Sequence, residues 1–438
     1  MSYRCGSCGY RSGKWMGFCP GCNAAEPLAE EVESRHRRVQ APELTPLGKV
    51  SDGTEVRRNV GIGELDRVLG GGLVAGSVVL IGGEPGVGKS TLVLQAAMEV
   101  AESGGRALVV TAEESAQQVG LRAERLAGST GKASTRQSRD QVLLLADDDL
   151  DRVLAAADEM RPDLLVVDSI QTVSCRQGDG AAGGPAQVRE SAARLIRFAK
   201  ERQVPTVLVG HVTKDGSLAG PKLLEHMVDV VLAFEGEPDQ GLRVLRCMKN
   251  RFGATHVAGM FEMSSDGLAE IADPSRVFLQ DWRQEVAGTV VFPAIEGRRS
   301  ILVELQTLTD ITRTVPARRS VRGVDPNRVH QLLAVLNRHA RLKVSDMEVY
   351  VNVVGGWSID EPACDLALAL ALASSLTEQP LGSTAAWGEV GLSGEVRSVT
   401  HHQRRLEEAR RIGVARVIAP EPGGRLDLAS ALLGAGIR

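Results

Sequence analysis

The feature that most restricts the fold of this 438-residue chain is a glycine-rich segment that directly follows an apolar run at residues 77–82. It fits the pattern G-x-x-x-x-G-K-[ST] and reads Gly83, Glu84, Pro85, Gly86, Val87, Gly88, Lys89, Ser90 and Thr91. Such a segment predicts a strand, a loop whose backbone N–H groups surround phosphate oxygens, and a helix over residues 90–101. Lys89 would neutralise the β- and γ-phosphates of ATP, and the Ser90 hydroxyl would bind Mg²⁺. The alternative is a glycine-rich turn without function, and the strand–loop–helix context argues against it.

Apolar strands alternate with amphipathic helices over residues 48–275, a pattern typical of an α/β domain with a parallel sheet wrapped by helices. Ligand sites of such sheets form at the carboxyl ends of the strands. Asp168 ends one expected strand, and we expect it to support Mg²⁺ there. Glu113 and Glu114 follow another strand, at 106–111. We expect one of the pair, preferably Glu113, to orient and deprotonate the attacking water. The alternative is an acidic helix start.

Further candidates leave the same edge of the expected sheet. His211 follows an apolar strand, where it could sense the γ-phosphate or serve a structural role. Two glycine-rich segments, 178–185 and 214–221, are either ordinary connections or loops that grip a nucleic-acid strand inside a ring. Lys214 and Lys222 favour the second interpretation, because phosphate backbones attract lysine.

The amino-terminal segment contains four of the seven cysteines, as two Cys-x-x-Cys pairs: Cys5, Cys8, Cys19 and Cys22. Each pair can form a tight turn whose sulfurs point at one ion, and two such turns make a closed thiolate site that suits structural zinc. A redox-active dithiol is the alternative. We expect residues 1–28 to form a zinc finger and the polar residues 29–47 a linker. The finger's basic residues are compatible with DNA and with a protein partner alike: Arg4, Arg11 and Lys14.

Composition limits the location and the partners. The 51 basic and 55 acidic residues give a net charge of −4, so any nucleic-acid site must be a local basic patch. Only 14 aromatic residues argue against a broad base-stacking surface. The chain opens without a signal-peptide pattern, and its most apolar run, 366–373, is far shorter than the ~20 residues of a membrane helix. We therefore expect a cytoplasmic protein with no membrane contact.

Four segments of the region 48–275 form a recognisable set: residues 63–73, the phosphate loop, 113–115 (Glu-Glu-Ser) and 168–171 (Asp-Ser-Ile-Gln). Together they resemble a RecA-type ATPase. The pentapeptide Lys-Asn-Arg-Phe-Gly at 249–253 and the four-cysteine finger extend the resemblance over nearly the whole chain. With them, the chain resembles the bacterial RadA (Sms) family of recombination and DNA-repair proteins.

The family resemblance implies a role for two residues of the pentapeptide. Lys249 and Arg251 would reach the nucleotide of a neighbouring subunit and stabilise the charge that develops on its γ-phosphate. A solvated basic turn is the alternative. The resemblance also implies a closed homo-oligomeric ring, a hexamer, that acts on single-stranded and branched DNA together with a RecA-type recombinase.

The order of elements over residues 280–438 resembles the α+β proteolytic domain of Lon, with strands near 289–292, 301–308, 347–354 and 385–390 and helices near 327–339, 362–375 and 402–412. Lon uses a Ser–Lys dyad. Here Ala363 stands at the serine position and Gln403 at the lysine position, so nucleophile and base are both absent. Cys364 is adjacent but has no evident base. We expect an inactive protease relic kept for assembly and DNA contact.

A basic stretch within this third region supports DNA contact. Between Arg313 and Lys343 there are eight Arg or Lys residues against one acidic residue, Asp325. Such a stripe binds phosphate backbones without reading sequence, although an ordinary solvated face is the alternative. The expected DNA contacts are Arg318, Arg319 and Arg322.

The sequence as a whole therefore predicts a DNA-dependent ATPase with ATP, Mg²⁺ and Zn²⁺ as cofactors. We expect such an enzyme to move along single-stranded DNA, and its resemblance to the RadA family implies that it promotes branch migration of recombination intermediates. Two alternatives stay open: an ATP-switched scaffold that recruits a recombinase without moving, and an ATP-dependent protease.

Overall fold

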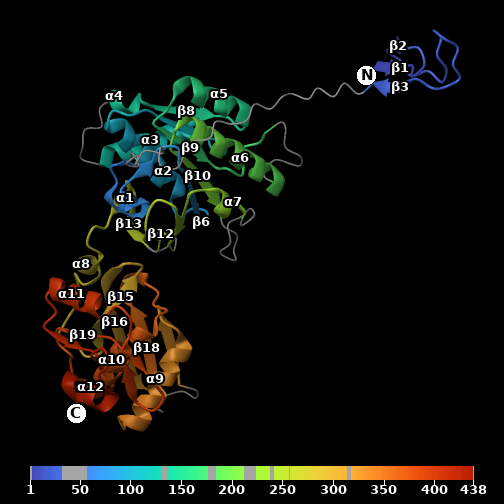
Figure 1. Ribbon diagram of the computed structural model, residues 1–438. Helices are drawn as coiled ribbons and strands as arrows, with labels where there is room; N and C mark the ends of the chain where they lie inside the picture. Colours follow the sequence, from blue (N-terminus) through green and yellow to red (C-terminus); the bar gives the residue numbers. More distant parts are fainter. Residues whose placement is uncertain are drawn as a thin grey trace, which may run out of the picture. The chain divides into compact units, whose positions relative to one another are not determined.

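The computed structural model describes residues 2–31, 57–129, 136–175, 184–211, 223–236, 241–255, 257–312, 317–344 and 346–437. The chain divides into two compact units, Met1–Thr54 and Glu55–Arg438, each of which is treated by itself. Figure 1 labels their helices and strands.

The first unit is a small three-stranded ribbon with the strand order β2-β1-β3, and all its pairings are antiparallel. Its strands are β1 (Ser2–Arg4), β2 (Arg11–Ser12) and β3 (Ala29–Glu31). The strand β3 carries the ribbon past the boundary expected at residue 28. Only Cys5, Cys19 and Leu28 are buried hydrophobic residues in this described segment, so packing alone gives it little stability.

The second unit begins with a nine-stranded sheet whose order is β14-β13-β12-β11-β6-β10-β9-β7-β8. The six strands from β11 to β8 are parallel, and β12 to β14 continue the sheet antiparallel. The strands are β6 (Val78–Gly83), β7 (Ala107–Thr111), β8 (Val142–Ala146), β9 (Leu164–Asp168), β10 (Thr206–His211), β11 (Val230–Glu235), β12 (Leu242–Asn250), β13 (Ala258–Ser264) and β14 (Gly267–Glu270). The expected parallel sheet is confirmed.

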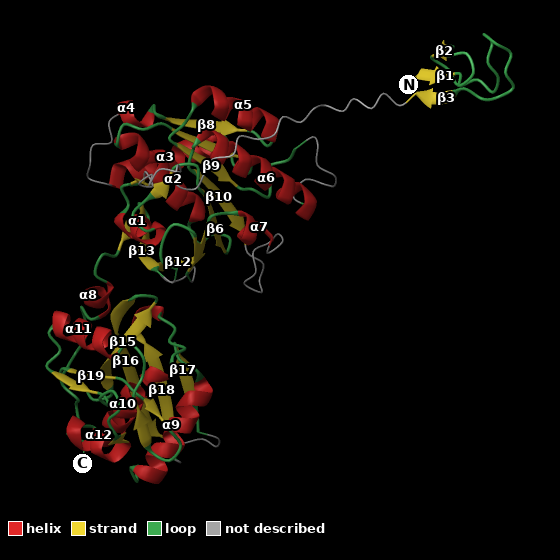
Figure 2. Cartoon of the chain, viewed as in Figure 1, coloured by secondary structure: helices red, strands yellow, loops and turns green. Residues whose placement is uncertain are grey.

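Helices cover both faces of this sheet (Figure 2). They are α1 (Gly63–Leu69), α2 (Lys89–Glu102), α3 (Ala116–Ser129), α4 (Arg136–Arg139), α5 (Leu150–Met160), α6 (Pro185–Arg202) and α7 (Leu223–Met227), and the short strands β4 (Arg57–Arg58) and β5 (Leu73–Val74) pair beside them. Successive residues of β6 serve opposite cores: Val79 and Ile81 pack with α2, whereas Val78 and Leu80 pack with α5 and α6. A strand buried on both faces reads as a continuous apolar run, as residues 77–82 do.

The carboxyl-terminal part contains a mixed six-stranded sheet in the order β17-β18-β16-β15-β19-β22 and a small sheet β20-β21-β23. Its strands are β15 (Thr289–Glu296), β16 (Arg299–Ile311), β17 (Arg319–Arg322), β18 (Met347–Val353), β19 (Thr384–Ala386), β20 (Glu389–Val390), β21 (Glu395–Arg397), β22 (Arg416–Ile418) and β23 (Leu426–Asp427). Its helices are α8 (Pro274–Phe278), α9 (Pro326–His339), α10 (Asp365–Thr377), α11 (His402–Ile412) and α12 (Leu428–Ala435).

Two elements of this part differ from expectation. The single strand expected at 385–390 is two strands, β19 and β20, which belong to different sheets. The chain leaves the first sheet at Gly388, whose N–H donates to the Ala363 carbonyl at 2.8 Å. The helix expected at 362–375 begins with the 3-10 turn Pro362–Cys364 before α10.

The apolar run 366–373 lies within α10 and is completely buried in the core of this part. A helix that is apolar all round belongs in such an interior. Within the part of the chain that the structure describes, none of the helices combines the length and apolarity needed to cross a membrane.

Candidate nucleotide and metal sites

The phosphate loop lies between the carboxyl end of β6 and the amino end of α2. The helix starts one residue earlier than expected, at Lys89, and ends one residue later, at Glu102. A Cβ on Gly83 would come within 2.3 Å of the Phe234 carbonyl oxygen, so β11 leaves room only for glycine. Gly88 has a φ of 113°, the left-handed region in which glycine is favoured. The backbone is thus shaped as the sequence predicts.

Lys89 is the central cation of this loop. Its side chain is 4% exposed, and its Nζ donates to the Gly83 carbonyl at 2.8 Å and the Glu84 carbonyl at 2.9 Å. Burial lowers the pKa of Lys89, and the charges of Asp168 and Glu113 oppose that shift. The ammonium therefore lies within reach of both carboxylates that the sequence singled out, and Ser90 follows it on α2.

The two carboxylates come from neighbouring strands. In the parallel ladder Thr111, which ends β7, pairs with Asp168, which ends β9. Two residues beyond Thr111, an oxygen of Glu113 accepts a hydrogen bond of 2.5 Å from the Ser169 hydroxyl. The structure thus brings Glu113 to the residue after Asp168, on the same edge as the phosphate loop.

Glu113 and Glu114 have different partners. Glu114 accepts two hydrogen bonds, at 2.7 and 2.8 Å, from the guanidinium of Arg122, which lies on α3. The helix itself begins only at Ala116, so neither glutamate belongs to its first turn. An acidic helix start does not describe this pair.

His211 pairs with Gly83 in the ladder between β10 and β6, which places its backbone beside the phosphate loop. The side chain of His211 is outside the described residues.

Lys249 and Arg251 lie at the opposite end of the sheet from their own phosphate loop. The backbone N–H of Arg251 donates to the Asp229 carbonyl, and that of Asp229 donates to the Val78 carbonyl. Val78 begins β6 and Gly83 ends it. Five strand residues at ~3.3 Å each separate the two ends by roughly 16 Å. These two cations are therefore remote from the nucleotide site of the same chain.

Neither cation is a freely solvated side chain. Arg251 donates from Nη1 to the carboxylate of Asp229 at 3.0 Å, and that carboxylate also accepts from the Val78 N–H at 3.1 Å. Arg251 nevertheless keeps a half-exposed side chain, whereas Asp229 is buried. Lys249 donates to three carbonyls at the end of α7, those of Glu225 (2.7 Å), His226 (3.2 Å) and Val228 (2.8 Å). Burial, followed by the nearby Arg251 charge, lowers the pKa of Lys249.

Sequence reasoning missed three polar residues that support these groups: Ser169, Asp229 and Arg243. Arg243 is 3% exposed, and its Nε donates to the Val87 carbonyl in the phosphate loop at 3.0 Å. Burial lowers the pKa of Arg243. The available signal was the position of Arg243 among apolar residues of β12. A charged side chain that is buried in a strand needs a hydrogen-bond partner, so this position indicates a specific contact.

The residues expected to contact DNA are partly described. Lys214 and Lys222 lie outside the described residues. Arg318, Arg319 and Arg322 are all exposed, on or next to β17. In the ladder with β18, Arg322 pairs with Asn352 and Arg319 with the buried Val349, so these two arginines fall on opposite faces.

The basic stretch does not remain wholly available to a ligand. Arg328 belongs to it, yet its Nε donates at 2.7 Å to the fully buried carboxylate of Asp365 and a second nitrogen pairs with the same group. Arg328 therefore neutralises an internal charge, as buried carboxylates require.

The region that resembles the Lon active site has no nucleophile–base pair among the residues described there. Ala363 is buried, and Gln403 is exposed and donates to Glu407 of its own helix at 3.0 Å. Burial raises the pKa of Cys364 to about 12, so its reactive thiolate form is suppressed.

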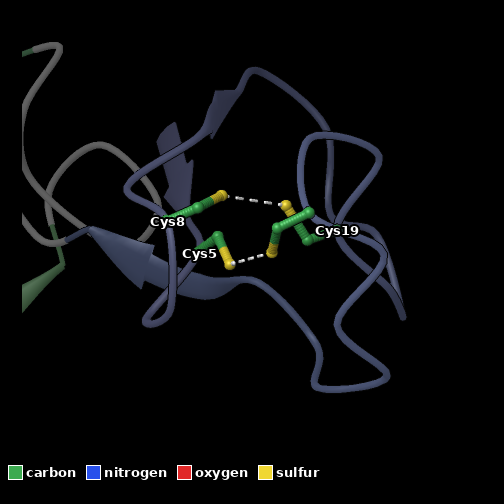
Figure 3. Close-up of side chains that lie close together, drawn as sticks. Cys5, Cys8 and Cys19 are labelled. Carbon is green, nitrogen blue, oxygen red and sulfur yellow. Dashed lines mark hydrogen bonds between the residues drawn. The ribbon is translucent and has the colours of Figure 1, made fainter.

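The four cysteines of the ribbon converge on one point (Figure 3). The sulfurs of Cys5 and Cys22 are 3.8 Å apart and those of Cys8 and Cys19 are 3.4 Å apart, and all four lie within 4.8 Å of one another. Tetrahedral bonds of about 2.3 Å to zinc place sulfurs about 3.8 Å apart, so the set fits that ion. Backbone N–H groups, first that of Cys8, lower the pKa of the Cys5 thiol, whereas neighbouring sulfurs raise the pKa of Cys8 and, together with partial desolvation, that of Cys22. A bound cation would offset this mutual repulsion and allow all four to be thiolates.

Removing the metal is expected to unfold the ribbon, because three buried residues cannot hold it together. A zinc-selective chelator should make the four ribbon thiols reactive toward a thiol reagent, while Cys175, Cys247 and Cys364 stay buried and slow. Basal ATP hydrolysis should not change. Metal content measured alongside should fall by one zinc per chain as the thiols appear. Thiols that react equally fast with and without the chelator would contradict a metal-dependent fold.

Comparison with known proteins follows the same division of the chain. Models of three families match: a rubredoxin metal binding domain at residues 3–30, an AAA domain at 45–217 and the C-terminal proteolytic domain of Lon protease (S16) at 333–429. At lower similarity, a crystal structure of the RadB recombinase aligns with 49% of this chain and 99% of its own, at 23% identity and a TM-score of 0.40.

Full-length relatives cover almost the whole chain. It is 47% identical to the DNA repair protein RadA of Pseudomonas aeruginosa, over 95% of this chain and 92% of that protein. It is 44% identical to the DNA repair protein RadA of Halalkalibacterium halodurans, over 96% and 92% of the two chains. For the protein of that name from Bacillus subtilis the identity is 43%, over 95% and 91%.

Proposed function

This chain belongs to the family of the bacterial DNA repair protein RadA, and from that premise we propose that it hydrolyses ATP to drive a ring-shaped motor on DNA. It consists of a four-cysteine zinc ribbon, a RecA-like ATPase domain and a Lon-like domain. The motor would act in the cytoplasm on single-stranded and branched DNA, beside a RecA-type recombinase, and would promote branch migration of recombination intermediates.

Hydrolysis at one site would use residues of the phosphate-loop edge. Lys89 would leave its two loop carbonyls to bind the β- and γ-phosphates, and Ser90 and Asp168 would hold Mg²⁺. When bound, Mg²⁺ neutralises phosphate charge. Glu113, oriented by the Ser169 hydroxyl, would take a proton from water as the water oxygen bonds to the γ-phosphorus. The bond to the bridging oxygen breaks, which leaves ADP and inorganic phosphate.

The observation that carries the ring is the separation of Arg251 from its own phosphate loop, at the two ends of β6. When the nucleotide site lies at one end of a domain and the residue that completes it lies at the other end, copies of the chain associate head to tail. Such contacts form a closed ring when the rotation between neighbouring subunits permits it. Arg251 is anchored by Asp229 and still half exposed, which suits a residue presented to a neighbour. Lys249 would have to leave three carbonyls to act in the same way.

The Lon-like domain, without a dyad, would serve assembly and DNA contact through Arg318, Arg319 and Arg322. We propose no peptidase activity, since Ala363 carries no nucleophile.

A three-stranded branch-migration assay tests the motor directly. The wild-type protein with ATP and Mg²⁺ should extend the exchanged strand, and Lys89→Ala should reduce the rate by about 100-fold or more, because the γ-phosphate loses its buried cation. The control is DNA binding by both proteins, which should be similar. A wild-type protein that binds the substrate and the recombinase, hydrolyses ATP and moves no branch would instead support the scaffold.

A further inference from the structure

The zinc ribbon carries exposed aromatic side chains, whereas the aromatic side chains elsewhere in the chain are buried or half-buried. All 14 aromatic residues of the chain lie among the described residues. The exposed ones are Tyr10, Trp15 and Phe18, at 41%, 63% and 57% of their surface, and all three belong to the ribbon. Apolar rings left in water at one place mark a contact surface, because hydration of each ring is unfavourable.

Tyr10 contacts the second cysteine turn, 19–22, and Trp15 and Phe18 lie shortly before that turn in the chain. Tyr10 lies against Gly21, where a Cβ would come within 3.3 Å of its ring. The Trp15 ring lies over Gly17, whose Cβ would be 3.7 Å from ring carbon Cη2, and Phe18 directly precedes the buried Cys19. The backbone that carries the rings is therefore fixed by the metal-binding turn.

The segment that carries these rings contains basic residues and no acidic ones. Residues 2–25 include Arg4, Arg11 and Lys14 and no aspartate or glutamate. Arg4 and Arg11 are direct cross-strand partners of β1 and β2, and the guanidinium of Arg4 lies 3.5 Å from a Cβ placed on Gly9, next to Tyr10. The acidic residues of the ribbon are Glu26 and, on β3, Glu30 and Glu31, whose backbones pair with those of Tyr3 and Ser2 on β1.

Exposed rings and cations on one segment that has no carboxylates match the chemistry of single-stranded nucleic acid. Bases stack on aromatic faces whatever their sequence, and the phosphates need cations beside the rings. A protein partner would also use aromatic anchors, but it gives no reason to exclude carboxylates from the surface.

We propose that the ribbon is a separate binding site for single-stranded DNA, in which Trp15 and Phe18, with Tyr10 at their side, stack on bases. Arg4, Arg11 and Lys14 bind the adjoining phosphates. The proposal rests on the proposed function, because it requires that DNA is the substrate. It also refines the prediction from composition. The aromatic residues of the chain are too few for a broad base-stacking surface, but three of them form a small stacking surface in a single segment.

The test compares two ligands and two full-length proteins. The ligands are an oligothymidylate of ~30 nucleotides and the same backbone with abasic sites, which keeps the phosphates and removes the stacking bases. The variant is Trp15→Ala with Phe18→Ala. The matched control is Leu121→Ala with Leu392→Ala, which removes two side chains of similar exposure, 69% and 71%, outside the ribbon. Affinities are measured by fluorescence anisotropy, with one zinc per chain verified for each protein.

The wild type and the control should prefer the oligothymidylate, and Trp15→Ala with Phe18→Ala should reduce that preference by about 10-fold or more. Affinity for the abasic ligand should stay within about twofold, because phosphate contacts are intact. A Trp15→Phe variant should restore most of the preference.

Two results would overturn the assignment. One is an unchanged preference in the double variant, with zinc bound. The other is the same unchanged preference accompanied by lost binding to a recombinase filament. That result would identify the rings as a protein-docking surface. Branch migration separates this failure from a failure of the proposed function. A wild type that moves branches while the double variant keeps its base preference refutes only the ribbon site. A wild type that binds no DNA refutes both.

Discussion

Arg251→Ala is expected to lower the DNA-stimulated kcat for ATP by about 1,000-fold or more while ATP affinity stays within about twofold, because a cation supplied by a neighbouring subunit acts on the charge of the transition state. Arg251 is linked through Asp229 to Val78, at the far end of β6 from the loop that would bind the phosphates of its own chain. Single-turnover hydrolysis and binding of a fluorescent ATP analogue separate the two quantities. Arg152→Ala, another exposed arginine of this domain, should leave both unchanged.

Mixing two inactive variants makes this prediction sharper. Arg251→Ala subunits keep an intact phosphate loop, and Lys89→Ala subunits keep Arg251, so a mixed assembly contains complete interfaces. Mixtures should recover a substantial part of the activity that both pure proteins lack. Since Arg251→Ala also removes a partner of the buried Asp229, its melting temperature should be measured. Absence of recovery with a well-folded variant would show that Arg251 acts within its own chain or not at all.

Glu113→Gln should reduce kcat by about 100- to 10,000-fold and preserve ATP binding, because glutamine cannot take the proton of the attacking water. Its amide oxygen can still accept the hydrogen bond that Ser169 donates to Glu113 at 2.5 Å, so the local geometry should persist.

Glu114→Gln is the matched control for this experiment. The Glu114 carboxylate forms an ion pair with Arg122. Its replacement by an amide should change kcat by only a few-fold, because a partly exposed ion pair contributes little free energy. If Glu114→Gln were the more severe change, the roles of the two glutamates would have to be exchanged.

The local geometry of the phosphate loop could be predicted because its determinants are consecutive residues. Glycines at 83, 86 and 88 and the helix that begins at Lys89 follow from one short pattern. The apolar strands that alternate with helices likewise predicted the parallel sheet. A strand such as β6, which is buried on both faces, has an apolar or small residue at every position. The four cysteines predicted the ribbon in the same way.

The supporting residues could not be predicted, because their partners are far away in the chain. Arg243 reaches Val87 across 156 positions, and no local pattern carries that information. The different partners of Glu113 and Glu114, Ser169 and Arg122, are 56 and eight positions away from them, and no local pattern predicts either contact. Lys249 was expected to reach the nucleotide of a neighbouring subunit, and no sequence pattern shows that carbonyls at the end of α7 accept hydrogen bonds from it. The exposure of the ribbon's rings is equally a property of packing.

Asp229 connects the amino end of β6 to Arg251. One of its carboxylate oxygens accepts from the first N–H of that strand, and the other accepts from Arg251. A strand pulled along its axis when triphosphate fills the loop would carry the arginine with it, toward or away from the next copy. In the proposed ring, ATP binding in one protomer would thus change the position of the arginine that acts on the neighbouring site. Hydrolysis would then proceed from one protomer to the next, and its rate would depend steeply and sigmoidally on ATP concentration.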